Sequence, residues 1–260
     1  MNNKFFNNIE KSISQSRLST YNNYSNGTNS KEVIINYILN AKISENFYFL
    51  LQNLEVSLRN AIYDSFKIHY PTSDFFFLHE IDSRNRYKSN KEKHSRECWK
   101  MICAAKYNIL SKRININDGK IISELNFGFW IKILLSTDTK YTNMWRKIFI
   151  EVFPNYKIMT SIDSDKIIVG TIINQIRNFR NRIFHYEPIF NQANLNQIHE
   201  DIIKVLGWIN KDIQELSMTF DEFNLIRMEK EYITRQFRKK ILSKKINNSK
   251  FKKKYKTIRK

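Results

Sequence analysis

Apolar residues recur at helical spacing over a long segment in the first quarter of the chain. From Glu32 to about Phe66 they fall every three or four positions, so that they line one side of a helix. These positions are Ile35, Ile38, Leu39, Phe47, Leu50, Leu51, Leu54, Leu58 and Ile62. The pattern predicts a helical segment, and either one long helix or two in succession fits it.

The remainder of the chain predicts further helices that end at turn signals or prolines. A polar stretch at 22–31 separates a short amino-terminal element from the long segment, and 69–95, which contains Pro71, is expected to be irregular. The sequence Asn-Asp-Gly at 117–119 is expected to be a turn. We expect helices over about 91–112, 142–152, 164–185 and 195–216, an apolar run over 123–136, and a last, highly charged helix from about 219.

Composition favours an all-α fold. Apolar residues make up 42% of the chain and aromatic residues 14%, which is too many for a disordered protein. Only five Gly and three Pro occur, so the punctuation that separates many short strands is missing. We therefore expect one helical domain, a bundle over residues 1–234, followed by a basic tail over 235–260.

The positive charge is concentrated in that tail. Thirteen of the 44 Lys and Arg lie in 235–260, which holds no Asp or Glu. The remaining 31 basic and 25 acidic residues give residues 1–234 a charge of only +6, against +19 for the whole chain. The tail is expected either to attract a polyanion such as RNA or to be a solvated, frayed helix.

Cysteine usage and hydropathy favour a cytoplasmic protein. Cys98 and Cys103 lie five residues apart in a predicted helix, a spacing that suits neither a disulfide nor a zinc pair, so we expect two buried, reduced thiols. No stretch reaches the roughly 18 apolar residues of a membrane span, and the first residues lack the apolar core of a signal peptide. The histidines share no ligand-like spacing, so we expect no metal and no cofactor.

Two further groups of residues have ordinary structural interpretations. Glu55 and Arg59 lie four apart on a predicted helix, where they would form an intrahelical ion pair. Phe127, Phe129 and Trp130 fall in an apolar run and are expected in the core rather than in a base-stacking surface.

The predicted helix at 164–185 carries an apolar seam backed by an unusual polar stripe. On a wheel of about 100° per residue, the seam consists of Ile172, Ile176, Phe179 and Ile183. The stripe on the opposite side consists of Asn174, Arg177, Asn178, Asn181 and His185. It holds no acid, whereas solvated helix faces usually mix Lys with Glu. Amide, guanidinium and imidazole groups suit a phosphate or ribose ligand, although a plain solvated face is the common alternative.

Pro188 is expected to end this helix at about Tyr186 or Glu187, because the residue before a proline is pushed out of helical geometry. His185 then lies in the last turn, where the helix dipole favours its cationic form. A histidine that gains or loses a proton near neutrality suits acid–base chemistry at a phosphate.

The segment RNFRNRIFHYEPIF at 177–190 resembles the carboxy-terminal signature of the Abi-like (abortive infection) proteins, a branch of the HEPN superfamily. Three more segments resemble the same family in the same order: SQSRLSTY at 14–21, NLEVSLRNAIYDSF at 53–66 and SELNFGFWIKILLS at 123–136. The resemblance spans roughly residues 10–215 and leaves out the tail.

The resemblance implies an up-and-down helical bundle, usually dimeric, that cleaves RNA without a metal and acts as a toxin in phage defence or a toxin–antitoxin pair. By the family's motif, His185 transfers protons, Arg180 stabilises charge on the phosphoryl oxygens, and Asn181 orients His185 or the substrate. Arg177 is the alternative phosphate ligand, because it lies about 80° from His185 on the wheel and Arg180 about 140°. Three residues are expected to contact RNA: Arg177, Asn178 and Tyr186. The family's pattern also allows Arg59 to face the active site, as the alternative to its ion pair with Glu55.

The motif supplies one histidine per chain, so a homodimer with two apposed motif helices is expected to supply both acid and base. Family members often carry a second histidine where this chain has Tyr186, and a small residue where it has Phe184. These departures lead to two alternatives: an inactive RNA-binding or protein-binding module, and an antitoxin-like partner of a nucleotidyltransferase.

Overall fold

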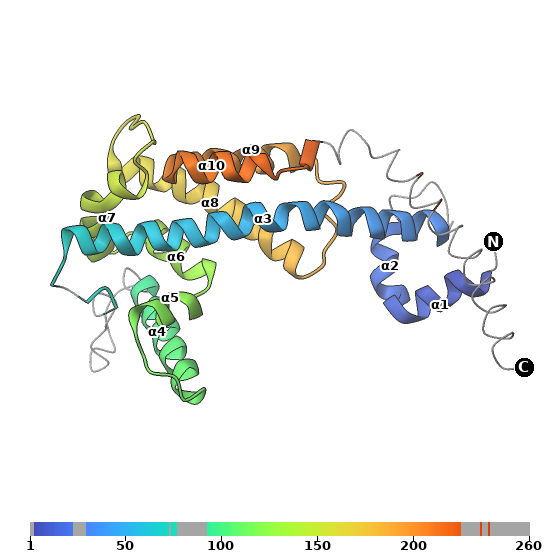
Figure 1. Ribbon diagram of the computed structural model, residues 1–260, viewed down its shortest axis with the longest axis horizontal. Coiled ribbons are helices and arrows are strands. Elements are labelled where there is room, and N and C mark those ends of the chain that lie inside the picture. The colour runs from blue at the N-terminus through green and yellow to red at the C-terminus, as the bar shows by residue number, and fades with distance from the viewer. Residues whose placement is uncertain are drawn as a thin grey trace, which may run out of the picture. The chain divides into compact units, whose positions relative to one another are not determined.

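A computed structural model describes residues 3–22, 30–72, 74–76, 93–224, 235 and 239. Over these residues the secondary structure is helical, which confirms the all-α prediction (Figure 1). The helices are α1 (Asn3–Ile13), α2 (Gln15–Asn22), α3 (Ser30–His69), α4 (Lys93–Ser111), α5 (Asp118–Glu124), α6 (Phe127–Leu135), α7 (Thr139–Val152), α8 (Ile162–Phe184), α9 (Leu195–Ile209) and α10 (Lys211–Thr219).

The chain forms two compact units. The terminal unit comprises Met1–Tyr48, Arg182–Leu195 and Asp221–Lys260, and the central unit comprises Phe49–Asn181 and Asn196–Phe220. Helices α3 and α8 each contribute residues to both units. The expected boundary at residue 234 lies outside the described residues and stays a prediction.

Several helix boundaries differ from those expected. The long apolar segment forms one helix, α3, which ends at His69, shortly before Pro71. The expected turn at 117–119 is instead the start of α5, because the Asn117 side chain accepts a hydrogen bond from the Lys120 amide at 2.9 Å and caps the helix. The helix expected over 195–216 is divided in the same way, since Asn210 caps α10.

Aromatic side chains dominate the core of the central unit. Phe127, Phe129 and Trp130 are buried on α6, as predicted. The Phe75 ring stacks on Trp130 with centroids 5.9 Å apart. Trp145 on α7 donates from its indole Nε1 to the Ile133 carbonyl at 2.9 Å, which ties α7 to α6 while satisfying the buried indole.

The two cysteines have different environments. Cys98 is buried on α4, as predicted, and burial raises the pKa of its thiol to about 11. Cys103 is exposed, so the expectation of two buried thiols was wrong for this residue. Five residues advance a helix by about 140°, which places Cys103 well away from the face that buries Cys98.

In the part of the chain that the structure covers, no helix is long and apolar enough to cross a membrane. Nor do three or more His, Cys, Asp or Glu side chains in that part come together in a way that could hold a metal ion.

The terminal unit has a small core of its own. Leu18 and Tyr21 of α2 and Val33 of α3 are buried together. Phe190, six residues beyond the end of α8, packs on this cluster and stacks on Tyr21 with centroids 5.8 Å apart. This contact fixes the chain that leaves α8 against the amino-terminal helices.

Candidate functional site at the end of helix α8

Helix α8 buries the predicted seam with one shift. Ile176, Phe179 and Ile183 are buried as expected, whereas Ile172 is only half-buried and Ile173 is buried beside it. Near the start of the helix, Gly170 allows close packing on α6, since a Cβ there would lie 2.6 Å from Leu135 Cδ2. The side of α8 that faces the core is therefore the one that the apolar period predicted.

The polar stripe is only partly exposed. Asn178 and His185 are exposed, while Asn174, Arg177 and Asn181 are half-buried. A solvated face would expose all five side chains, so neighbouring elements partly cover three residues of this stripe.

The helix ends earlier than Pro188 alone predicts. Its last helical residue is Phe184, not Tyr186 or Glu187. The Tyr186 amide donates to the Ile183 carbonyl at 2.9 Å and the Glu187 amide to the Arg182 carbonyl at 2.8 Å. These two bonds form a Schellman motif, which stops the helix before the proline acts. His185 is the C-cap of α8 rather than part of its last turn, and it is exposed.

Tyr186 occupies the position of this motif that normally holds glycine. Its φ is 57°, in the left-handed region, and its side chain is 71% exposed. The guanidinium of Arg17 lies over its ring, 5.9 Å from the centroid. A tyrosine at this position is strained and gains little burial, which is typical of a residue retained for a purpose other than packing.

Two side chains of the terminal unit fix the backbone around His185. Arg17 donates from Nη2 to the His185 carbonyl at 3.0 Å. Asn40, which is 4% exposed, accepts from the Ile189 amide at 2.7 Å and the Phe190 amide at 3.2 Å. Its Nδ2 also donates to the Glu187 carbonyl at 3.2 Å. The histidine backbone is therefore anchored while its imidazole faces solvent.

In the central unit, Arg180 forms an ion pair with Glu55, which was expected to pair with a different arginine. Its Nη2 lies 3.4 Å from Glu55 Oε2 on α3, and both side chains are largely buried. Glu55 was expected to pair with Arg59 on its own helix, and that expectation was wrong. The interhelical ion pair holds the Arg180 guanidinium beside a carboxylate of α3.

Arg177 lies against the first turn of α6. Its Nη2 donates to Asn178 Oδ1 at 3.1 Å, and a Cβ placed on Gly128 would lie 3.4 Å from its Nη1. A Cβ at position 128 would be in van der Waals contact with the guanidinium, so the end of the Arg177 side chain lies beside the backbone of α6. Arg177 is thus a half-buried cation of the central unit.

The candidate residues are divided between the compact units. Arg177, Asn178, Arg180 and Asn181 belong to the central unit, whereas His185 and Tyr186 belong to the terminal unit. Helix α8 carries the first four and ends one residue before His185.

Three residues that position these groups were not predicted from the sequence to do so. Arg17 and Glu55 lie in the segments at 14–21 and 53–66, whose patterns gave neither residue this role. Asn40 lies outside those segments, and only its buried position in α3 distinguishes it from other asparagines.

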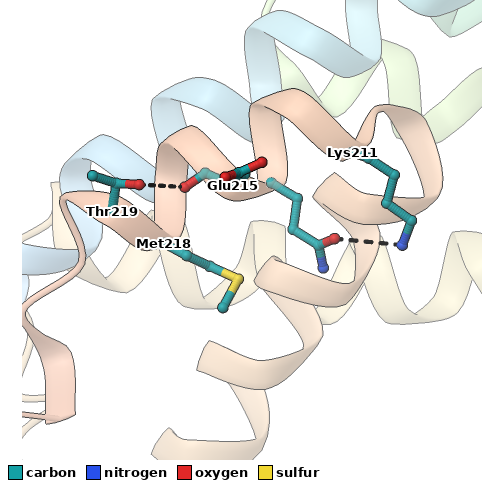
Figure 2. Close-up of a pocket in the computed structure, with 5 residues that line it drawn as sticks. Lys211, Glu215, Met218 and Thr219 are labelled. Carbon is teal, nitrogen blue, oxygen red and sulfur yellow. Dashed lines mark hydrogen bonds between the residues drawn. The ribbon is translucent and has the colours of Figure 1, made fainter.

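A separate pocket lies on α10, remote in sequence from the motif. Figure 2 shows Lys211, Glu215, Met218 and Thr219 around it, and Gln214 completes the lining. Thr219 Oγ1 donates to the Glu215 carbonyl at 2.9 Å, and Lys211 Nζ donates to Gln214 Oε1 at 3.4 Å (Figure 2). These polar groups pair within one helix and offer no histidine or arginine, so we assign the pocket no part in the chemistry of the motif.

No protein-family model matches the sequence, and searches of curated proteins and of solved structures also gave no match.

Proposed function

We propose that this chain is a metal-independent endoribonuclease of the Abi-like, HEPN type, which acts as a toxin in phage defence or in a toxin–antitoxin system. The observation that carries the proposal is the exposed His185, anchored by its backbone at the end of the helix that bears Arg180 and Asn181. Exposure allows an RNA strand to reach the imidazole, and the anchored backbone limits where that imidazole lies.

In the proposed reaction, the ribose 2′-hydroxyl attacks the adjacent phosphorus and the bond from phosphorus to the 5′-oxygen breaks. A base removes the proton of the 2′-hydroxyl, and an acid delivers a proton to the departing 5′-oxygen. The products are a 2′,3′-cyclic phosphate and a free 5′-hydroxyl. Protons and charge balance without an external cofactor.

His185 serves as the acid or base, Arg180 stabilises the charge that develops on the phosphoryl oxygens, and Asn181 orients the imidazole or the substrate. Because one chain supplies one such histidine, we propose that a homodimer with apposed α8 helices supplies both. Arg177, Asn178 and Tyr186 are assigned to RNA binding, through charge, amide hydrogen bonds and ring stacking.

The test is cleavage of a labelled RNA in EDTA by the wild type, His185→Ala and the matched control His69→Ala. His69 pairs with Glu151 at 2.9 Å in the central unit, so its replacement removes a histidine that has no role in the proposal. We expect His185→Ala to lose roughly 100-fold to 10,000-fold in rate, the range for a general acid or base, with the control close to wild type. Equal rates of RNA cleavage by the wild type and His185→Ala would refute the assignment of His185 as the acid or base.

Tyr186 favours a second candidate function, because it stands where the family often has a second histidine. In that case the protein binds RNA or a protein partner, or acts as an antitoxin-like partner of a nucleotidyltransferase, without turnover. Salt-sensitive RNA binding, with the RNA intact after long incubation in EDTA and in Mg²⁺, would favour the binding module over the ribonuclease.

A further inference from the structure

Three arginines in the central unit have a buried Nε without a hydrogen-bond partner among the described residues: Arg59, Arg177 and Arg180. Arg180 is also paired with Glu55 through Nη2. Arg59 on α3 and Arg177 on α8 are both half-buried. Within the described part of the chain, the Nε of each is fully buried and has no hydrogen-bond partner. Such donors are rare in native proteins, since an unsatisfied buried donor costs about 1–3 kcal/mol and more when it is charged. Each of these Nε donors can therefore gain a hydrogen-bond partner.

The register of α3 and α8 places these two arginines at one level. The helices run in opposite directions (Figure 1), and Glu55 on α3 contacts Arg180 on α8. One turn further along α3 is Arg59, about 6 Å on, and one turn back along α8 is Arg177, about 4.5 Å back. Arg59 lies on the same face of α3 as Glu55, four residues away, and Arg177 lies on the same face of α8 as Arg180, three residues away. This register places the two arginines, each with an unsatisfied Nε, at about the same level of α3 and α8.

The first turn of α6 adds positive potential at the same place. Arg177 lies against Gly128, and a Cβ there would also come within 3.1 Å of Asn126 Oδ1. Asn126 is the N-cap of α6 and accepts from the Phe129 amide at 3.1 Å, so this is the positive end of the helix dipole. A guanidinium against a helix amino terminus is unfavourable unless an anion lies between or beside them.

The local charges do not balance. Arg59 and Arg177 carry two positive charges, and none of the ion pairs among the described residues supplies a carboxylate to either of them. An oxyanion with several acceptor atoms would balance these cationic groups. It would also accept hydrogen bonds from the buried Nε donors and lie favourably at the helix amino terminus.

We propose that Arg59 and Arg177, beside the first turn of α6, bind a phosphate group. Planar guanidinium groups bind phosphate oxygens with two parallel hydrogen bonds, and the Nε atoms provide the donors for that geometry. The assignment of this phosphate to an RNA backbone rests on the proposed function, whereas the anion site itself does not depend on cleavage.

The first experiment measures binding of inorganic phosphate to the full chain by calorimetry at constant ionic strength. The variants are Arg59→Gln and Arg177→Gln, with Arg146→Gln as the control for loss of one positive charge in the same unit. Arg146 is exposed and pairs with Asp163 at 2.6 Å. We expect each cluster variant to weaken phosphate binding at least tenfold and the control to match wild type. Phosphate binding to both cluster variants as tight as to wild type would overturn the proposal.

Thermal melting in phosphate-free buffer gives a second readout. Since each substitution relieves repulsion between unsatisfied cations, both cluster variants should melt no lower than wild type. A marked loss of thermal stability would mean that these arginines have protein partners and no need of an anion, and would also overturn the proposal.

A third arm identifies the source of the phosphate, with an uncleavable RNA in which every 2′-hydroxyl is methylated. If inorganic phosphate displaces this RNA from the wild type but not from Arg59→Gln, the site binds the RNA backbone. If phosphate binds equally well with and without the RNA, the site binds a small phosphate compound. A protein that binds phosphate through this pair but fails to cleave RNA would refute the ribonuclease proposal alone.

Discussion

Replacement of Tyr186 by glycine and by alanine measures the backbone strain at the end of α8. Tyr186 has φ of 57° at the position of a Schellman motif that glycine normally occupies. Both substitutions remove the exposed ring and its contact with Arg17, so they differ only in the backbone. The left-handed conformation costs a residue with a Cβ about 1–2 kcal/mol, and glycine avoids that cost.

Glycine also has a more flexible unfolded chain, which offsets about 0.5–1 kcal/mol of this advantage. Tyr186→Gly should therefore be more stable than Tyr186→Ala by about 0.5–1 kcal/mol, although glycine lowers stability at most positions. The ring itself contributes about 0.5 kcal/mol through Arg17, so Tyr186→Ala should fall slightly below wild type.

Amide hydrogen exchange is the appropriate assay, because the two compact units need not unfold together. The amides of Tyr186 and Glu187 make the bonds of the motif. We expect them to exchange roughly two to five times more slowly in the glycine variant than in the alanine variant. Equal exchange, or slower exchange in the alanine variant, would refute the assignment of strain to this residue.

Three other predictions follow from contacts away from the histidine. Asn40→Ala should destabilise the turn after α8 by about 2 kcal/mol, because it leaves buried amides unsatisfied, and limited proteolysis should then cut that turn; unchanged resistance would contradict this. An alkylating reagent should modify the exposed Cys103 and spare the buried Cys98 in the native protein. Mass spectrometry would detect one adduct, and two adducts under native conditions would be inconsistent with the fold. Hydrogen bonds from Arg146 hold the pKa of Asp163 in the folded protein below its ordinary value near 3.8. This pair should therefore stabilise the fold above pH 3.8, and the stabilisation should be lost as the pH falls through the pKa of Asp163 in the folded protein. Acid unfolding of Asp163→Asn should lack this contribution, and a pH profile identical to wild type would rule it out.

Local patterns in the sequence predicted the helical class and the buried side of α8. Ile176, Phe179 and Ile183 recur with the helical period, and burial follows that period wherever a helix packs on one side. The helical period misplaced the seam by one residue at Ile172, since the structure buries Ile173 and leaves Ile172 half-buried.

Turn signals were less informative, because the same residues cap helices. Asn117 reads as part of a turn in the sequence, yet its side chain caps α5. At the end of α8, a proline predicts where helical geometry must stop, but a tyrosine with positive φ stops it sooner. No propensity assigns that conformation to tyrosine.

Contacts between helices that are distant in sequence could not be predicted from the sequence. Glu55 reads as the partner of Arg59, four residues away, and only the packing of α3 on α8 assigns it to Arg180. The buried, unpartnered Nε atoms of Arg59 and Arg177 are likewise a result of helix packing, which no pattern within one helix indicates. Residue types marked the candidate site, and tertiary register decided which of those residues interact.

The chemical identity of the cleavage products tests the central claim most directly. An RNA with a single ribonucleotide in an otherwise deoxyribose strand would be incubated with the protein in EDTA, and the products analysed by mass spectrometry. We predict cleavage only after the ribonucleotide, with a 2′,3′-cyclic phosphate on one product, a 5′-hydroxyl on the other, and no such products from His185→Ala. Cleavage at deoxyribose positions, or products that end in a 3′-hydroxyl and a 5′-phosphate, would contradict attack by the 2′-hydroxyl and the role of His185.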